Sequence, residues 1–308
     1  MNPILVTGAS GFIGTHLVGS LARQGLDVVS VSRKSGFQED KRHFRVDLCD
    51  TAAMQKLFRQ FSFSSVVHLA AAGVSDEENF ADLVAVNTLA TGAFARVALA
   101  NKVQRFIYVG SGFEYRPQAR PMDESTPLGA PNLYGASKAA GWMMLDALFR
   151  LEGLPLVTLR PFSVYGPGEN PAKLVPYVIS QALRSEPIRL TLGSQVRDYV
   201  FVEDVVDALL LGVTGPASPG QVYNIGAGPQ EAKSVRQFVE EILAAMGVPP
   251  RLCWFDRAAR SRLDPPYLVS DPTRAHLELG WRPRVRFEEG IARTIEWYSS
   301  ARVQEMSA

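Results

Sequence analysis

One stretch near the start of the chain limits what the rest can fold into. It reads Thr7-Gly8-Ala9-Ser10-Gly11-Phe12-Ile13-Gly14 and follows an apolar run at residues 4–6. A short strand, three spaced glycines and an apolar-periodic segment are typical of the strand–turn–helix unit that binds a dinucleotide pyrophosphate at the helix N-terminus. The first glycine permits the tight turn, the second lets the backbone approach the pyrophosphate, and the third lets the helix pack close to the strand. We therefore expect a dinucleotide site that includes Gly8, Ser10, Gly11, Phe12, Ile13 and Gly14.

Composition bounds the size of the protein and excludes several classes of function. A chain of 308 residues can form one large α/β unit, or one domain with a smaller lobe. The formal net charge is +1, with 32 basic and 31 acidic residues, so we expect neither nucleic acid nor membrane as a partner. The 2 cysteines and 4 scattered histidines have no metal-ligand spacing. We expect a cytoplasmic protein, because the first strand leaves no room for a signal peptide and no apolar run approaches the roughly 20 residues of a membrane span.

The order of the predicted elements indicates the fold class. Short β-like runs alternate with helical patterns in the first half, as in βαβ crossovers, and the six predicted strands fit a doubly wound parallel Rossmann sheet with ligand at its carboxyl ends. We expect residues 1–163 to form this dinucleotide-binding domain, rejoined by about 199–226, and residues 164–308 to form mainly a smaller C-terminal substrate lobe. Strands are predicted at 4–6, 28–31, 44–46, 66–69, 106–109 and 156–159, and helices at 13–23, 51–58, 80–101, 134–151, 175–183, 205–211, 235–246, 273–279 and 288–297.

The end of the second predicted strand bears on the choice of cofactor. An acidic residue at this place would hold the ribose 2′-hydroxyl of NAD, but the chain has Ser32 and Arg33, followed by Lys34. A hydroxyl and a guanidinium suit a 2′-phosphate, because Arg binds phosphate through a planar fork of donors. The alternative is that these cations only cover a strand end. We expect NADP, with NAD as the alternative, and further dinucleotide contacts from Asp47, Leu48, Leu69, Ala70, Ala71 and Pro161.

Three residues together predict proton-transfer chemistry. Tyr134 and Lys138 lie at i and i+4, on one face of a predicted helix. A nearby ammonium lowers the pKa of a tyrosine from about 10 toward the working range for proton transfer. Ser111 follows the fifth predicted strand, at the same edge of the sheet as the glycine turn, whereas His68 is expected to be packed or hydrogen-bonded rather than catalytic. Singly the three residues are unremarkable; jointly they indicate a proton donor, a tuning cation and a hydroxyl that holds a carbonyl oxygen beside a nicotinamide.

In this order and spacing, the motifs resemble those of the extended short-chain dehydrogenase/reductases that act on nucleotide sugars. The resemblance implies that Tyr134 is the catalytic acid/base, that Lys138 binds the nicotinamide ribose and tunes the tyrosine, and that Ser111 is the catalytic hydroxyl. It also implies that Arg197 contacts the substrate diphosphate and that Asn87 is structural. It covers nearly the whole chain, at 7–14, 68–71, 86–88, 111–115, 134–138, 159–168, 197–205, 223–226 and 279–281.

Two departures from the family pattern concern the substrate phosphates. Ser163 stands where many members have an Asn that contacts the phosphate of the sugar nucleotide. The second phosphate-binding arginine is expected three residues before Asp264, where this chain has Ser261. Its neighbours Arg260 and Arg262 are the candidates for that contact, and we include Arg262 with Ser111, Ser163 and Arg197 among the expected substrate-binding residues.

A third departure concerns the reaction. Members that eliminate water from the sugar carry an Asp-Glu pair directly after the catalytic Ser/Thr, but this chain has Gly112 and Phe113. Glu114 comes one position late, and along an extended segment it would point to the opposite face. The sequence therefore predicts NADPH-dependent reduction of a nucleotide-linked 4-keto-6-deoxyhexose, and residues 164–204 most resemble synthases that carry out such reductions. The alternatives are a nucleotide-sugar 4-epimerase with tightly held NAD(P) and a non-catalytic NADP-binding sensor.

Assembly is predicted from apolar residues on two helices. They give more apolar surface than burial against one sheet face requires. Relatives pair these helices across a twofold axis, so we expect a homodimer; the alternative is that all of them are intrachain core. The residues are Val84, Leu89, Phe94 and Val97 on one helix and Trp142, Met143, Leu145 and Leu148 on the other.

Overall fold

The main sheet has seven parallel strands in the order β3-β2-β1-β4-β5-β6-β10. The computed structural model describes residues 2–33, 42–73, 79–257 and 264–307. β1, β2 and β4 are buried along their whole length, as expected for a parallel sheet covered on both faces. The strands are β1 (Ile4–Thr7), β2 (Val28–Ser32), β3 (His43–Arg45), β4 (Ser65–His68), β5 (Arg105–Val109), β6 (Leu156–Pro161) and β10 (Val222–Ile225).

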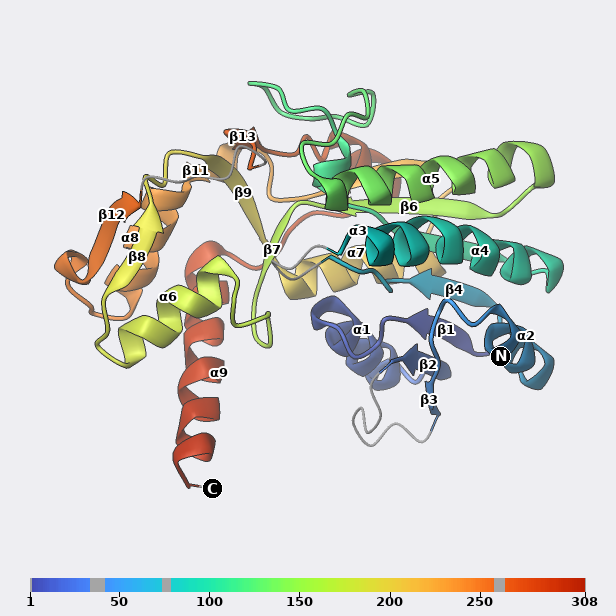
Figure 1. Cartoon of the computed structure of the whole chain (residues 1–308), viewed down its shortest axis with the longest axis horizontal. Helices are drawn as coiled ribbons and strands as arrows, with labels where there is room; N and C mark the ends of the chain where they lie inside the picture. The colour runs from blue at the N-terminus through green and yellow to red at the C-terminus, as the bar shows by residue number, and fades with distance from the viewer. Residues whose placement is uncertain (1, 34–41, 74–78, 258–263, 308) are drawn as a thin grey trace.

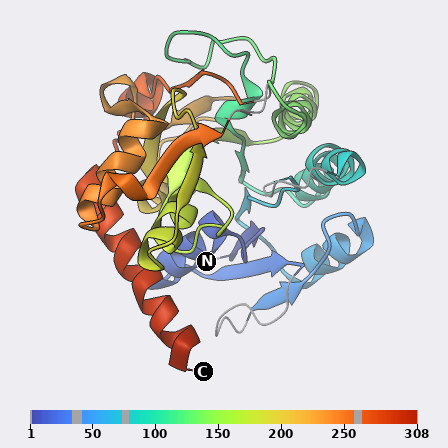
Figure 2. The same ribbon diagram turned by 60° about the vertical axis from the view of Figure 1, so that its left-hand side comes forward.

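Helices cover both faces of this sheet, which confirms the predicted doubly wound α/β fold (Figure 1). One apolar core lies between the sheet and α1 and α7, and a second lies between the sheet and α2, α4 and α5. Figure 2 shows α2, α4 and α5 stacked along one side of the molecule. The helices are α1 (Phe12–Arg23), α2 (Thr51–Gln60), α3 (Phe80–Asp82), the π-helix η1 (Leu83–Ala90), α4 (Thr91–Ala100), the 3-10 turn η2 (Gly112–Glu114), α5 (Leu133–Glu152) and α7 (Val202–Thr214).

A smaller lobe is built mostly from the second half of the chain and has its own apolar core. It contains a four-stranded sheet in which β9 pairs with β7, β11 and β13, and a two-stranded sheet of β8 and β12. Its elements are β7 (Ser163–Tyr165), α6 (Leu174–Leu183), β8 (Ile188–Thr191), β9 (Val196–Phe201), η3 (Pro229–Glu231), β11 (Ala232–Ser234), α8 (Val235–Ala245), η4 (Pro250–Leu252), β12 (Cys253–Arg257), β13 (Tyr267–Leu268) and α9 (Phe287–Ser307). The π-helical turn η5 (Ala275–Leu279) instead packs in the core of the main sheet, beside α7.

Two expectations from the sequence need correction. The main sheet gains a seventh strand, β10, which pairs with β6 from far along the chain. The helix predicted at 80–101 is divided into α3, η1 and α4.

The expectation that no apolar run approaches the length of a membrane span is also corrected. Taken as one segment, Phe80–Ala100 is 21 residues long and apolar enough to cross a membrane by length and composition. Half of its apolar window is buried against the rest of the protein, so it is a core helix here.

Candidate active site

The glycine turn has the geometry that the sequence predicts. Gly8 follows β1 with φ of +69°, and a Cβ at this position would lie 2.6 Å from the main-chain nitrogen of Ala70. A Cβ at Gly14 would lie 2.3 Å from the carbonyl oxygen of Gly8, so α1 can pack against the turn only with glycine there. Gly11 is the N-cap of α1, and Ser10, Phe12 and Ile13 surround it in the chain. A turn with glycine at its closest backbone approaches, placed at a helix N-terminus, fits a dinucleotide pyrophosphate.

At the end of β2, the hydroxyl of Ser32 contacts a histidine and the guanidinium of Arg33 is exposed. Ser32 is buried, and its Oγ lies 3.1 Å from Nε2 of His43. The other nitrogen of His43, Nδ1, lies 2.9 Å from Oγ of Ser30, so the imidazole links the two serines. Arg33 is exposed directly after the strand. Lys34 lies outside the residues that the structure describes.

The remaining predicted dinucleotide residues lie at the carboxyl ends of neighbouring strands. The Asp47 carboxylate accepts a hydrogen bond of 2.9 Å from the backbone N–H of Cys49, and Leu48 packs in the core. Ala70 follows β4, and its N–H lies 3.3 Å from Oγ1 of Thr7. Parallel strands bring their carboxyl ends to one edge, so these residues share that edge with the glycine turn. Leu69 and Ala71 flank Ala70, and Pro161 ends β6.

His68 is a structural residue, as expected. It is fully buried, with Nδ1 2.8 Å from Oγ1 of Thr7 and Nε2 3.0 Å from Oγ1 of Thr91. Burial, with a contribution from the positive charge of Lys138, lowers the pKa of His68 to about 3. The ring is therefore neutral at physiological pH and ties β1, β4 and α4 together.

Tyr134 and Ser111 are carried by two turns that pack against each other. Tyr134 lies in the first turn of α5, where the Asn132 side chain caps the helix through a 2.8 Å bond from the N–H of Gly135. Ser111 caps η2, and its Oγ accepts a hydrogen bond of 3.2 Å from the N–H of Phe113. A Cβ at Gly135 would lie 2.2 Å from the carbonyl oxygen of Phe113, so glycine permits this close approach.

Lys138 lies one turn further along α5 and points beneath the end of β5. Its Nζ donates a 2.8 Å hydrogen bond to the carbonyl of Val109, two residues before Ser111. It also lies 4.4 Å from the ring centroid of Tyr108. Burial lowers the pKa of Lys138 to about 8, and the negative charge of Glu114 opposes part of that change. The three predicted catalytic residues therefore come from adjoining segments at the ligand-binding edge of the sheet.

Asn87 has the structural role expected for it. Its side chain accepts a 2.8 Å bond from the N–H of Ala72 and donates a 3.1 Å bond to the carbonyl of the same residue. It also donates a 2.9 Å bond to Oγ of Ser137. Asn87 lies within the π-helical segment η1, and it joins the end of the β4 loop to the helix that carries Tyr134.

The acidic residue near Ser111 has a different setting from the one expected. Residues 112–114 form a 3-10 turn instead of an extended segment, and Glu114 is completely buried. Its carboxylate is bound by Arg160, with Nε 2.7 Å from Oε2. Glu114 is therefore turned away from the substrate side, but by the 3-10 turn and the ion pair rather than by strand alternation.

Two of the expected substrate-binding residues, Ser163 and Arg197, lie on strands of the lobe. Ser163 is half-buried in β7, which pairs with β9 at Tyr199. Arg197 is buried in β9, where its guanidinium is bound by the Asp264 carboxylate and donates a 2.8 Å bond to the carbonyl of Pro265. A diphosphate at Arg197 must therefore compete with Asp264 for the guanidinium. Arg260 and Arg262 lie outside the described residues.

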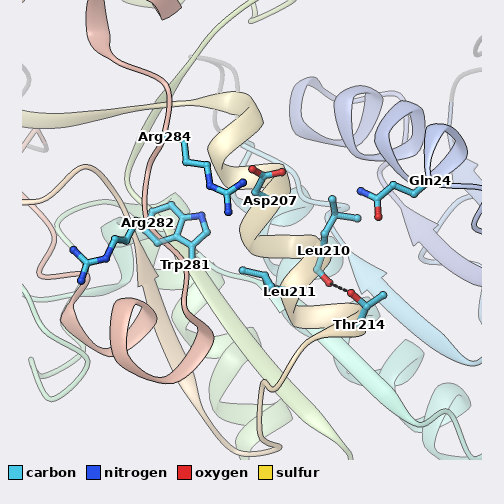
Figure 3. Close-up of a pocket in the computed structure, with 8 residues that line it drawn as sticks. All are labelled: Gln24, Asp207, Leu210, Leu211, Thr214, Trp281, Arg282 and Arg284. Carbon is cyan, nitrogen blue, oxygen red and sulfur yellow. Dashed lines mark hydrogen bonds between the residues drawn. The ribbon is translucent and has the colours of Figure 1, made fainter.

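A surface hollow of about 240 Å³ lies elsewhere, on the outer side of α7 (Figure 3). Gln24 and Thr214 line it, and both stand at C-terminal ends of helices that precede a strand. The hollow is thus at the edge opposite to the carboxyl ends of the strands. The Trp281 indole donates a 2.8 Å bond to the carbonyl of Asp204, which holds the C-terminal segment against α7. The hollow is therefore a gap at the contact between the C-terminal segment and α7 of the same chain.

Known proteins share both the fold and the sequence motifs. Residues 4–226 match the NAD dependent epimerase/dehydratase family. The chain is 34% identical over 320 residues to the UDP-glucose 4-epimerase of Mycolicibacterium smegmatis (strain ATCC 700084 / mc(2)155), covering 96% of this chain and 97% of that protein. It is 30% identical over 335 residues to the dTDP-glucose 4,6-dehydratase of Haemophilus influenzae (strain ATCC 51907 / DSM 11121 / KW20 / Rd), with 97% and 98% covered. The solved structure of MoeE5 in complex with UDP-glucuronic acid and NAD has a TM-score of 0.88 and 31% identity, with 97% and 99% covered.

The fold and the residues at its ligand edge place the protein among NAD(P)-dependent enzymes. The length of the match identifies it further: the chain belongs to the NAD-dependent epimerase/dehydratase family, whose enzymes act on nucleotide sugars. This confirms the resemblance found in the sequence. Because both an epimerase and a dehydratase are similar to the chain over nearly its full length, the reaction has to be argued from its own residues.

Proposed function

We propose that the protein reduces a nucleotide-linked 4-keto-6-deoxyhexose with NADPH. The observation that carries this proposal is a complete Ser111, Tyr134 and Lys138 set in a site that lacks the acidic pair for elimination. When bound, the cofactor supplies a hydride to the keto carbon. Tyr134 gives its phenolic proton to the keto oxygen, Ser111 donates a hydrogen bond to the same oxygen, and Lys138 binds the nicotinamide ribose and favours proton release from Tyr134.

The surroundings of Gly112 argue against a dehydratase. A Cβ at Gly112 would lie 2.9 Å from the ring of Phe162, so that ring occupies the space beside the position where dehydratases carry their Asp. Phe113, at the position of the Glu, packs against an apolar cluster that contains Tyr115 and Phe162. The only acid in this turn, Glu114, is bound to Arg160. The wall next to Ser111 is therefore apolar, which suits a sugar that has already lost its C6 hydroxyl.

Cofactor choice is proposed from the end of β2. Ser32 replaces the acid that would hold the 2′-hydroxyl of NAD, and Arg33 is exposed where a 2′-phosphate would lie. MoeE5 was solved with NAD, so NAD remains the alternative for this chain. A reductase exchanges its cofactor at each turnover, and the cellular NADPH pool is usually the one kept reduced. A 2′-phosphate site therefore has a purpose in a reductase that it lacks in an enzyme that retains its cofactor.

We propose that Arg197 binds the nucleotide diphosphate, with Ser163 and Arg262 as further contacts. Arg197 is already held in place by Asp264 and by two backbone carbonyls, those of Val196 and Pro265. A guanidinium oriented in this way loses little side-chain freedom when it binds an anion. The substrate is therefore a nucleoside diphosphate sugar.

The alternative is a 4-epimerase, which uses the same three residues but oxidises and re-reduces the sugar on a retained cofactor. It is favoured by the 34% identity to the M. smegmatis UDP-glucose 4-epimerase. A non-catalytic NADP sensor is the less favoured candidate, because a sensor has no need of an intact Ser111, Tyr134 and Lys138 set.

The two enzymatic alternatives differ in cofactor balance. With a nucleotide-linked 4-keto-6-deoxyhexose, the reductase consumes one NADPH for each sugar reduced. It does not interconvert ordinary nucleotide hexoses. Following the absorbance of the reduced nicotinamide while the sugar products are separated by chromatography tests both expectations. Formation of epimers without net loss of NADPH would establish the epimerase instead.

We also propose a homodimer, on a face smaller than the sequence predicted. Phe94, Val97, Leu145 and Leu148 are buried within the chain, so the expectation that they face a partner was wrong. The large apolar side chains that stay exposed on these helices are Phe80, Leu89, Leu133, Met143, Met144 and Leu151.

If two chains bury these exposed residues against each other, light scattering at micromolar concentration should give the mass of a dimer. Met143→Glu places charges across the shared face and is expected to shift the protein toward monomer. Leu192→Glu, at an exposed residue of the lobe, is the matched control that should remain dimeric. A wild-type protein with monomer mass would refute the dimer.

A further inference from the structure

We propose that Glu114 is a positioning residue of the active site. Its buried carboxylate fixes the turn that carries Ser111, and it supplies a negative charge that acts on Lys138. This inference rests on the proposed catalytic roles of Ser111, Tyr134 and Lys138. It assigns a purpose to an acid that stands one position after the places where dehydratases carry theirs.

The first line of support is the contact between Glu114 and Ser111. Oε1 of Glu114 accepts a 2.9 Å hydrogen bond from the backbone N–H of Ser111, while Oγ of Ser111 accepts one from the N–H of Phe113. Together these bonds form a capping box around a single 3-10 turn. The Ser111 oxygen is used as an acceptor within the turn, so its O–H remains able to donate to a substrate oxygen. The carboxylate thus sets the main-chain position from which that hydroxyl projects.

The second line of support is the rigid setting of the carboxylate. Arg160 binds Oε2 of Glu114, and its Nη1 donates a 2.9 Å bond to the hydroxyl of Tyr115. The guanidinium carbon lies 4.7 Å from the ring centroids of both Tyr115 and Trp142. The guanidinium and the carboxylate are almost completely excluded from solvent. Removing one member of a buried ion pair leaves the other uncompensated, so such a pair holds its geometry strongly.

The third line of support is the charge balance beneath the site. Lys138 and Arg160 are two buried cations, and Glu114 is the anion that acts on both. Among the residues that the structure describes, the other titratable groups near Lys138 are Tyr108 on β5, His68 on β4 and, one turn earlier on α5, Tyr134. His68 is neutral, and burial raises the pKa of Tyr108 well above its usual range, so neither supplies negative charge at neutral pH. The negative charge of Glu114 therefore favours the protonated forms of both Lys138 and Tyr134, which are the forms that reduction uses.

Two variants separate the geometric role from the electrostatic one. Glu114→Gln keeps an acceptor for the Ser111 N–H but removes the charge. Gly110→Ala keeps the charge but displaces the carboxylate, because a Cβ at Gly110 would lie 2.4 Å from Oε1 of Glu114. We expect both to lower kcat for the keto sugar by about 10–100-fold with little change in KM, since small misplacements of catalytic groups have effects of this size.

The pH dependence distinguishes the two variants. Removing a negative charge lowers the pKa of both Lys138 and Tyr134, and protonated forms of both are needed for reduction. The alkaline limb of the pH–rate profile should therefore move to lower pH in Glu114→Gln, by on the order of one unit. Gly110→Ala should keep the alkaline limb near its wild-type position. Glu114→Asp, which retains the charge, should keep it there too.

A matched control is Glu124→Gln. Glu124 is also a buried glutamate that accepts a backbone N–H, from Asn224 at 2.8 Å, and faces an arginine, Arg274. Thermal unfolding of each variant reports the purely structural cost. If Glu114→Gln retains wild-type kcat and pH profile, or loses no more activity than Glu124→Gln, then Glu114 is not a positioning residue.

A readout without substrate keeps the inference separate from the proposed reaction. The tyrosinate absorbance that Tyr134→Phe removes reports the titration of Tyr134 alone. In Glu114→Gln this titration should move to lower pH, whichever sugar the enzyme uses. An unmoved titration would overturn the electrostatic role of Glu114, whereas failure of every keto sugar would overturn only the proposed reaction. If Glu114→Gln does not fold, an unchanged kcat in Gly110→Ala would overturn the geometric role.

Discussion

Tyr134→Phe is expected to lower turnover by at least about 100-fold, the usual contribution of general acid catalysis, while NADPH binding survives. The substitution removes one hydroxyl and retains the ring. The ring packs beside Gly73, because a Cβ added at Gly73 would lie 3.2 Å from one of its carbons. Packing at the start of α5 should therefore be unchanged. Steady-state kinetics with the keto sugar and a separate cofactor titration measure the two quantities.

The matched control for this variant is Tyr298→Phe. The hydroxyl of Tyr298 donates a 2.7 Å bond to the carbonyl of Glu169, and the residue packs against the apolar core of the lobe. Its loss should lower stability slightly and leave turnover near the wild-type value. If Tyr134→Phe turned over nearly as fast as this control, another group would have to be the catalytic acid.

Arg33→Ala is expected to weaken NADPH binding by about 1.5–3 kcal/mol, the range of a charge-assisted hydrogen bond, and to leave NADH binding nearly unchanged. That loss corresponds to roughly 10–150-fold in the dissociation constant. The reason is that only NADPH carries a 2′-phosphate for the guanidinium to bind. Ser32 contributes less to the prediction, because its hydroxyl is already shared with His43.

Titrations of both cofactors against both proteins measure the effect. Arg59→Ala, which removes an exposed cation from α2, controls for the general change in charge. Equal losses of affinity for NADPH and NADH in Arg33→Ala would show that Arg33 does not bind a 2′-phosphate. NAD would then be the better candidate for the physiological cofactor.

The features that could be predicted from the sequence are local ones. The glycine spacing and the i, i+4 pair of Tyr134 and Lys138 each depend on a few consecutive residues. Chain order then determined the sheet edge at which they meet. All six predicted strands are present in the main sheet, and β1, β2 and β4 could be recognised because parallel strands buried on both faces read as continuous apolar runs. β10 is equally buried but follows a Pro- and Gly-rich segment, and its pairing with β6 is set by contacts distant in sequence.

Other features depend on tertiary contacts that no local pattern encodes. The π-helical turn η1 coincides with the side-chain bonds of Asn87 to Ala72 and Ser137, residues on two other segments. The position of the Glu114 carboxylate depends on its ion pair with Arg160, which lies far along the chain. The apolar stripes of α4 and α5 could not be divided into core and surface by periodicity alone, because these helices also pack against each other.

Reduction of a keto sugar at this site can be tested by following the transferred hydrogen. NADPH deuterated at its transferable position is supplied with a nucleotide-linked 4-keto-6-deoxyhexose, and the product is examined by mass spectrometry and NMR. We expect one carbon-bound deuterium at C4 for each cofactor oxidised, and none in the Tyr134→Phe protein on the same time scale. Product that carries no deuterium, or epimerised sugar formed while the labelled cofactor stays unconsumed, would contradict it.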